Sequence, residues 1–352
     1  MRAMHDNAVT SLASMTHYNT FREQLATAHP AFGYALWEPD PGDLYPPVEV
    51  GDVGFIRQGK FHRLFNALLP ANHESHQRFG VPERFEPLRL SVPNHIDHGT
   101  LYPNNFCSYG VTVESGGSDV FAVAPPTPDS AEVSFSCTRK HGAALSLPVV
   151  ARREDTLSQA HFGTWITRHI DSWFAFSQRH GLGIEMEDIV LVTGCHRTRS
   201  WSNIAFYESQ ADSRISLRVQ VPDVGTTVHW RVLSQRIQGA VLSHGPSGEN
   251  LPENQCLFIR GFRVKRLFWI IPRLKGAAGP QPDARGNDPE PEVELVPIPS
   301  VTESRDPLHV LLEYIAARAP DCDMALVHDD DLERILGVSD GTVSQGHNKR
   351  FY

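Results

Sequence analysis

Large apolar side chains recur at helical spacing near the middle of the chain. They lie three and four positions apart and share their face with one histidine: Phe162, Trp165, Ile166, His169, Ile170, Trp173 and Phe174. This period places them on one face of an α-helix. The pattern predicts a helix over residues 156–180, with a Thr156–Gln159 capping box at its start and Gly181 at its end. Because the face carries no reacting group and two predicted strands follow it directly, we expect it to pack on a sheet.

Short apolar runs separated by glycine and proline predict many strands. The runs are 32–37, 48–56, 60–69, 88–92, 106–114, 132–138, 143–147, 189–193, 200–207, 214–221, 226–233, 257–264 and 267–271. Short turns predict two hairpins, one joining 48–56 to 60–69 and the other joining 132–138 to 143–147. The expected fold is α+β: a mainly antiparallel twisted sheet or half-barrel, one long amphipathic helix packed on it, and a C-terminal helical extension.

Changes in composition along the chain predict five segments. They are a flexible N-terminal segment (1–31), a β-rich α+β core domain (32–275), a Pro-rich acidic linker (276–304), a C-terminal helical extension (305–336) and a disordered tail (337–352). The extension begins with Asp306-Pro307, and proline is favoured in a first helical turn. A helix is therefore expected over 308–318, followed by a strand at 324–327 and a short helix at 329–336.

Composition excludes some classes of protein. The chain has 352 residues and a net charge of −9 at pH 7, which argues against general nucleic-acid binding. Its five cysteines are scattered, with no two at CxxC spacing, so neither a disulfide framework nor a zinc knuckle is indicated. The sequence shows no apolar run typical of a signal peptide or a transmembrane segment. We therefore expect a cytoplasmic protein, and no motif predicts a cofactor.

A polar stretch around Asp97 is the candidate metal site. His95, Asp97 and His98 provide two imidazoles and a carboxylate within four residues, which are suitable ligands for Zn²⁺ or another divalent ion. No further ligand stands at recognisable spacing, and the chain has 18 histidines in all. The alternative is a polar loop whose side chains bond to the backbone. We favour this alternative and expect no stoichiometric metal.

A basic stretch near residue 260 is the candidate binding surface. Residues 257–279 contain no acidic residue and include Arg260, Arg263, Lys265, Arg266, Arg273 and Lys275. In a strand, Phe262 and Val264 face the core while Arg263 and Lys265 face the other way. The basic side could pair within the protein or be solvated, could meet anionic lipid or an acidic partner, or could bind nucleic acid, in that order of preference.

Two further clusters are interpreted as structural. Cys195-His196 would need the histidine beside the thiol to activate it, but neighbours in a strand point to opposite faces. The acids from Asp329 to Asp331 stand where a helix is expected to begin, and acids there interact favourably with the helix dipole.

Several sequence blocks carry a resemblance to known proteins. The blocks are 34–39, 48–55 with Phe65-Asn66, 133–137, 142–148, 190–195, 261–263, 274–280 and 306–315. In these blocks the chain resembles a family of intracellular proteins of mushroom-forming fungi that has no established function. The resemblance spans most of residues 32–331 and implies a cytosolic setting, but no catalytic residues. A weaker, topological resemblance links the helix and the following strand, which includes Leu191-Val-Thr193, to the pore-forming domain of gasdermins.

Two classes of function remain open at this stage. The first is a non-enzymatic interaction protein that acts on an unknown protein partner, at an anionic membrane surface or in fungal self-recognition. The alternative is an enzyme of unrecognised type, assisted by a metal at His95, Asp97 and His98.

Overall fold

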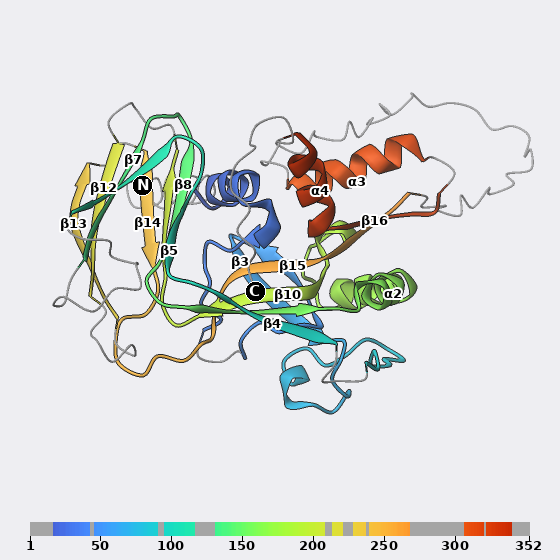
Figure 1. Cartoon of the computed structure of the whole chain (residues 1–352). Coiled ribbons are helices and arrows are strands. Elements are labelled where there is room, and N and C mark those ends of the chain that lie inside the picture. Colours follow the sequence, from blue (N-terminus) through green and yellow to red (C-terminus); the bar gives the residue numbers. More distant parts are fainter. Residues whose placement is uncertain are drawn as a thin grey trace, which may run out of the picture.

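The computed structural model describes residues 17–42, 46–90, 95–116, 131–207, 213–220, 228–236, 239–267, 306–319 and 322–339. The α+β class expected from the sequence is confirmed, and the strands pair in antiparallel fashion. Figure 1 shows the strands β7, β12 and β13 at one end of the molecule and the helices α2, α3 and α4 at the other. The strands form three sheets instead of the one sheet expected.

The main sheet carries the helices. Its strands are β1 (Tyr34–Ala35), β2 (Asp52–Arg57), β3 (Lys60–Asn66), β4 (Ile96–Leu101), β9 (Ala151–Thr156), β10 (Val190–Thr198), β15 (Gln255–Arg266) and β16 (Met324–His328). The two long strands β10 and β15 pair with each other and form its centre. Along its other edge, β10 pairs first with β2 and then with β9. The other edge of β15 pairs first with β1 and then with β16.

Two four-stranded sheets form a sandwich beside the main sheet. The inner sheet contains β5 (Asn104–Cys107), β8 (Gly142–Leu147), β11 (Ser202–Phe206) and β14 (Ala240–His244), and the outer sheet contains β6 (Val111–Gly116), β7 (Ala131–Cys137), β12 (Ser213–Gln220) and β13 (His229–Arg236). Successive side chains of the inner sheet point to opposite faces. Ala144 and Ile204 therefore join the core between the two sheets, while Leu145 and Ala205 join the core on the side of the main sheet.

Helices cover the main sheet. Residues 17–28 are helical, and the other α-helices are α2 (Gln159–Arg179), α3 (Pro307–Arg318) and α4 (Asp329–Ser339); short 3-10 helices are η1 (Pro30–Phe32), η2 (Glu74–His76) and η3 (Met186–Asp188). In α2, the side chains of Phe162, Ile166, Ile170 and Trp173 are at most 2% exposed and pack against the sheet. The spacing of the apolar residues therefore predicted the buried face of α2 correctly. However, α2 is one of several helices that pack on the sheet.

Some boundaries and pairings predicted from sequence are wrong. The helix begins at Gln159, because residues 151–156 form strand β9, and the Thr156 hydroxyl accepts a hydrogen bond from Ser158 N at 3.1 Å instead of forming a capping box. The strand predicted over 106–114 is divided into β5 and β6 by a turn at Gly110, whose φ of +84° suits glycine.

The second predicted hairpin does not form. Strands β7 and β8 are adjacent in the chain, but β7 pairs with β6 and β12 while β8 pairs with β5 and β11. Residues 88–90 have no regular secondary structure, whereas strands β4 and β14 had not been predicted. The strand predicted over 257–264 extends over Gln255–Arg266, and most of the predicted strand 267–271 lies outside the described residues.

The predicted segments also need correction. Residues 17–28 are not a flexible end, because Phe21 and Leu25 are each 1% exposed and belong to the core beside the inner sheet. The C-terminal extension contributes β16 to the main sheet, so it is part of the same structure. Residues 1–16, the predicted linker (276–304) and residues 340–352 lie outside the described residues.

Candidate functional site

A cleft of about 430 Å³ lies where four distant segments meet. The segments are the helix of residues 17–28, the turn between β2 and β3, the connection from α2 to β10, and the first turn of α3. Its ionisable lining residues are Arg22, Tyr34, Arg57, Asp188, Arg263, Asp306, His309 and Tyr18. The cleft therefore brings together charged groups from segments that are far apart in the sequence.

Two buried arginines form one wall of the cleft. The side chains of Arg22 and Arg263 are only 8% and 4% exposed. Arg263 reaches this position because it alternates along β15 with Phe262 and Val264, which pack towards α2 on the opposite face. Each guanidinium carbon lies 5.5 Å from the ring centroid of Tyr34, within the range of a cation–π interaction.

Asp306 lies between the two guanidinium groups. Its Oδ2 is 2.7 Å from Arg263 Nη1 and 3.9 Å from Arg22 Nη1. Its Oδ1 accepts a hydrogen bond from Leu308 N at 3.0 Å, so the same carboxylate caps the N-terminus of α3. Burial opposes ionisation of Asp306, but Arg263 and Arg22 outweigh it and hold the pKa of the carboxyl below its usual range.

The charges of the arginine pair are only partly balanced in the cleft. Arg22 has a second ion pair with Glu23, 3.3 Å away, on the side that does not line the cleft. Arg263 Nη1 lies close to Asp306, yet it is buried and has no acceptor with hydrogen-bond geometry among the described residues. Arg263 Nη1 is therefore held by an ion pair with a single carboxylate, and a guanidinium group favours anionic partners.

The rim of the cleft adds another arginine. Arg57 is exposed and donates from Nη2 to Leu182 O at 2.6 Å. His309 Nε2 lies 3.1 Å from Glu187 O and 3.9 Å from Asp188 Oδ1. Three arginines and two aspartates therefore line the cleft, and this arrangement suits a small anion that approaches from the rim.

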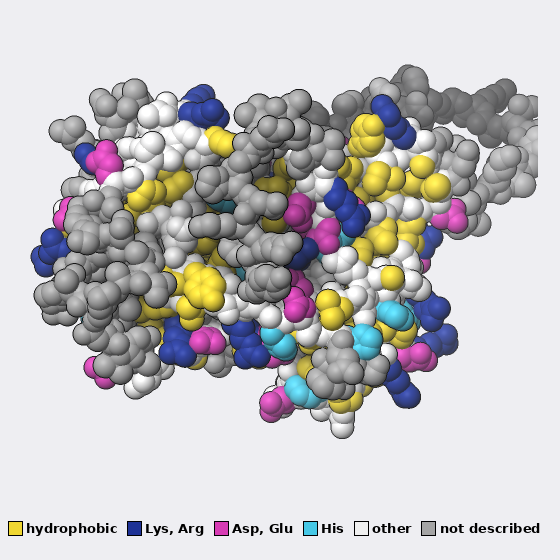
Figure 2. Space-filling model, viewed as in Figure 1, with side chains coloured by type: hydrophobic (Ala, Val, Ile, Leu, Met, Phe, Trp, Pro, Cys, Tyr) yellow, Lys and Arg dark blue, Asp and Glu magenta, His cyan; other side chains and the backbone are white. Residues whose placement is uncertain are grey.

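Most residues of the predicted basic surface form ion pairs within the protein. Arg260 pairs with Asp155, 3.3 Å away, and with Asp330; Lys265 pairs with Glu187 at 3.2 Å, and Arg266 pairs with Asp171. Arg273 and Lys275 lie outside the described residues. On the face of the molecule that Figure 2 shows, several basic side chains lie next to acidic ones. Of the four candidates that the structure describes, Arg263 alone lines the cleft.

The predicted metal ligands do not converge. His95 precedes β4, and its Nδ1 contacts the Ser158 hydroxyl. Asp97 and His98 lie on β4 and pair with residues of β9: Asp97 with Arg153, and His98 with Glu154. Within the described residues, no group of three or more His, Cys, Asp or Glu side chains is placed to hold a metal ion.

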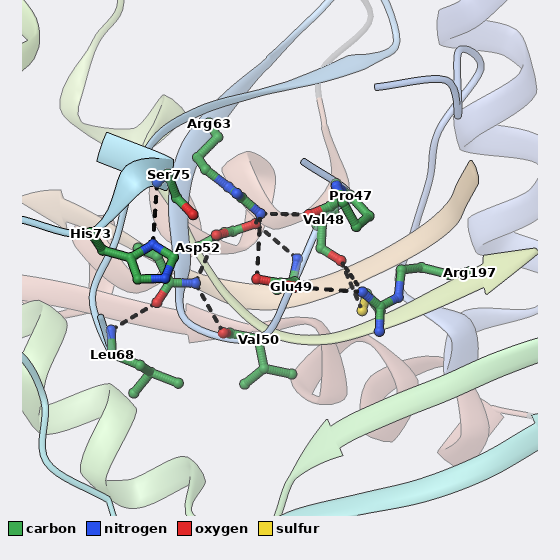
Figure 3. Close-up of polar contacts among 12 residues, drawn as sticks. Pro47, Val48, Glu49, Val50, Asp52, Arg63, Leu68, His73, Ser75 and Arg197 are labelled. Atoms are coloured by element: carbon green, nitrogen blue, oxygen red, sulfur yellow. Dashed lines mark hydrogen bonds and ion pairs between the residues drawn. The ribbon is translucent and has the colours of Figure 1, made fainter. Parts of the chain in front are cut away.

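A second buried polar cluster lies beside the β2–β3 hairpin (Figure 3). Asp52 is fully buried, and its Oδ2 accepts hydrogen bonds from Arg63 Nη2 at 2.5 Å and from Glu49 N at 2.8 Å. Its Oδ1 accepts from Asn66 Nδ2 at 2.8 Å. Because both oxygens already bind donors of the chain, we interpret this cluster as support for the hairpin and the loop before it.

The Cys195-His196 pair has the arrangement expected of two neighbours in a strand. Cys195 joins an apolar cluster, whereas His196 contacts the rings of Phe32 and Phe258. Burial raises the pKa of Cys195 well above its usual value, so its thiol remains protonated. This cysteine is therefore structural.

Comparison with known proteins identifies no relative of this chain. No protein-family model matches the chain, and a search of curated proteins finds no similar sequence. In the part of the chain that the structure describes, no helix has both the length and the apolar character needed to cross a membrane. Sequence reasoning had singled out Arg263 as basic and Asp306 as a helix start, but nothing in the sequence signalled that Arg22 and Tyr34 would join them.

Proposed function

We propose that this protein is a non-enzymatic binding protein that takes a small anion in the cleft beside Arg22 and Arg263. One observation carries the proposal: two guanidinium groups, each more than nine-tenths buried, line an open cleft and share one carboxylate. Burying a cation costs several kcal/mol unless it is well paired. Such a pair at the wall of a cleft therefore favours a binding role over a purely structural one.

The chemistry of the wall indicates a carboxylate or phosphate ligand. Guanidinium groups present several N–H donors in one plane and bind both kinds of group through paired hydrogen bonds. Asp306 already shows that a carboxylate fits between the arginines. The exposed Arg57 at the rim adds a further donor group.

The other functions considered from sequence have less support. A role at anionic membrane surfaces relied on the basic stretch near residue 260, but Arg260, Lys265 and Arg266 each form ion pairs within the chain. A metal-assisted enzyme relied on the predicted metal ligands, and two of these have partners on opposite faces of β4. The non-enzymatic class therefore remains the better proposal.

The test compares two exposed arginines. Arg57→Gln removes a donor from the rim of the cleft, whereas Arg179→Gln removes an arginine that pairs with exposed Glu83 away from the cleft. We expect phosphate or citrate to bind the unaltered protein and Arg179→Gln equally, and to bind Arg57→Gln at least about fivefold more weakly in isothermal titration calorimetry. Equal affinity for the two variants would contradict the location. No binding by either anion at about 10 mM would reject the proposed function, unless an Asp306 variant restores it as described below.

A further inference from the structure

We infer that Asp306 is an internal occupant of this anion site, and that a free anion competes with it and loosens helix α3. The inference rests on the proposed function and adds how the site is regulated. The ligand group would be a carboxylate or phosphate that takes the place of the Asp306 carboxylate between Arg22 and Arg263.

The position of Asp306 supports competition. Its side chain is 9% exposed and its Oδ2 faces both arginines, at 2.7 Å from Arg263 and 3.9 Å from Arg22. With the two arginines themselves nearly buried, a ligand can reach most of their donors only when this carboxylate moves. Ligand and carboxylate therefore cannot occupy the same place at once.

The same carboxylate connects the site to α3. Asp306 is the N-cap of this helix and accepts the Leu308 N–H, which otherwise has no partner within the helix. Moving the carboxylate removes this cap and also separates the first turn from the two arginines. The ligand would therefore act on α3 by displacing a single side chain, that of Asp306.

The remaining contacts of α3 allow local loosening. Leu308 and Leu312 pack in a small apolar cluster with Ala325 and Val327 of β16, separate from the cores beneath α2 and between the sandwich sheets. Strand β16 is held independently by five residue pairs with β15. An anion should therefore weaken the first turn of α3 and leave the pairing of β16 intact.

Thermodynamic linkage makes the proposal quantitative. If the docked Asp306 weakens anion binding by some factor, the anion must weaken docking of Asp306 by the same factor. Competition between a buried carboxylate and a free anion for the same cations is worth about tenfold or more. A change that weakens docking of Asp306 should therefore raise the affinity for the anion, and binding of the anion should lower the stability of the first turn of α3.

The first experiment replaces the internal carboxylate. In Asp306→Ser the hydroxyl still caps Leu308 N, but the charge is lost and the space between the arginines is vacated. Asp323→Ser is the matched control, because Asp323 is an exposed acid in the same C-terminal segment. We expect phosphate to bind Asp306→Ser about tenfold more tightly than the unaltered protein, with no change for Asp323→Ser. Equal affinity for all three proteins would overturn the inference and leave the proposed function standing.

The second experiment needs no variant and decides the matter if Asp306→Ser fails to fold. Hydrogen exchange of the unaltered protein is compared in phosphate and in chloride at equal ionic strength. Faster exchange in phosphate at residues 308–312, with unchanged exchange in β16, supports the inference. Unchanged or slower exchange at 308–312 while phosphate binds would overturn it. Absence of phosphate binding by both the unaltered protein and a folded Asp306→Ser would reject the proposed function itself.

Discussion

Asp97 and His98 are neighbours in the chain, yet their side chains have partners on opposite faces of β4. Asp97 Oδ2 lies 2.6 Å from Arg153 Nη2, and His98 Nδ1 lies 3.7 Å from Glu154 Oε1. Arg153 and Glu154 are themselves neighbours in β9, so the alternation of one strand matches that of the next. Two ligands that had looked close in the sequence are therefore directed apart by the strand that carries them.

We accordingly expect His98→Ala to change neither metal content nor stability. The side chain of His98 is 54% exposed, and Glu154 keeps its ion pairs with Arg152 and Arg197 when the imidazole is removed. The free energy of unfolding should change by less than about 0.5 kcal/mol, as for most exposed ion pairs. Elemental analysis that finds nearly one metal per chain, lost in His98→Ala, would show that the two faces do share an ion.

A second prediction concerns the packing of α2 on the main sheet. Trp173 is 2% exposed, and its ring lies 5.5 Å from that of Phe65 at an interplanar angle of 76°. Trp173→Ala should lower the free energy of unfolding by about 3–5 kcal/mol, because the vacated volume cannot be filled by neighbours. Tyr102→Ala is the control, since this aromatic side chain is 70% exposed. Denaturant melts showing similar small losses for both variants would mean that Trp173 is outside the core.

The sequence predicted those elements whose apolar residues recur at a regular spacing and lie on one buried face. The apolar face of α2 and the β2–β3 hairpin were predicted because their spacing and turn residues are local signals. Strand β9 was missed because its residues Arg152, Arg153, Glu154 and Asp155 look like the start of a charged helix. In the structure these charges are paired across to β4 and β10, and such partners are invisible before the strands are aligned.

The candidate site could be predicted only in part for a similar reason. The alternation along β15 correctly separated Arg263 from Phe262, which indicated that the arginine lies on the other face. The residues that meet it come from the N-terminal helix and from α3, at opposite ends of the chain. No local pattern predicts such a long-range meeting, so burial and pairing had to be seen in the structure.

A third prediction contrasts two glycines in the main sheet and its covering helix. A Cβ added to Gly194 in β10 would collide with Oδ1 of Asp155, whose carboxylate pairs with Arg260. In Gly163 of α2, the nearest atoms would be 3.4 Å away, which is ordinary contact. Gly194→Ala should therefore cost about 1–3 kcal/mol of stability through overpacking. Gly163→Ala should be neutral or stabilise the protein by up to about 1 kcal/mol, because alanine favours helix. Equal effects in thermal melts would show that Asp155 can move aside without cost.

The last prediction concerns the pH dependence of stability through His196. This side chain is 2% exposed and packs against the rings of Phe32 and Phe258, at centroid distances of 5.6 and 5.7 Å. Burial lowers the pKa of His196 from 6.5 to about 3, and the nearby positive charges of Arg260 and Arg153 act in the same direction. The folded protein therefore keeps this imidazole neutral at pH values where the unfolded chain binds a proton.

Proton linkage determines whether the protein gains or loses stability as the pH falls. Between pH 6.5 and about 3 the unfolded state binds more protons at this residue, so stability falls as the pH is lowered through that window. At pH 5 the loss should reach about 2 kcal/mol relative to pH 7.5. His196→Phe cannot titrate and keeps an aromatic ring beside Phe32 and Phe258, so the unfolding free energies of the two proteins should diverge by this amount as the pH falls from 7.5 to 5. His161→Phe, at an exposed position of α2, should show no such divergence from the unaltered protein. A constant difference between the unaltered protein and His196→Phe over this range would mean that His196 is protonated in the folded state or reached by water.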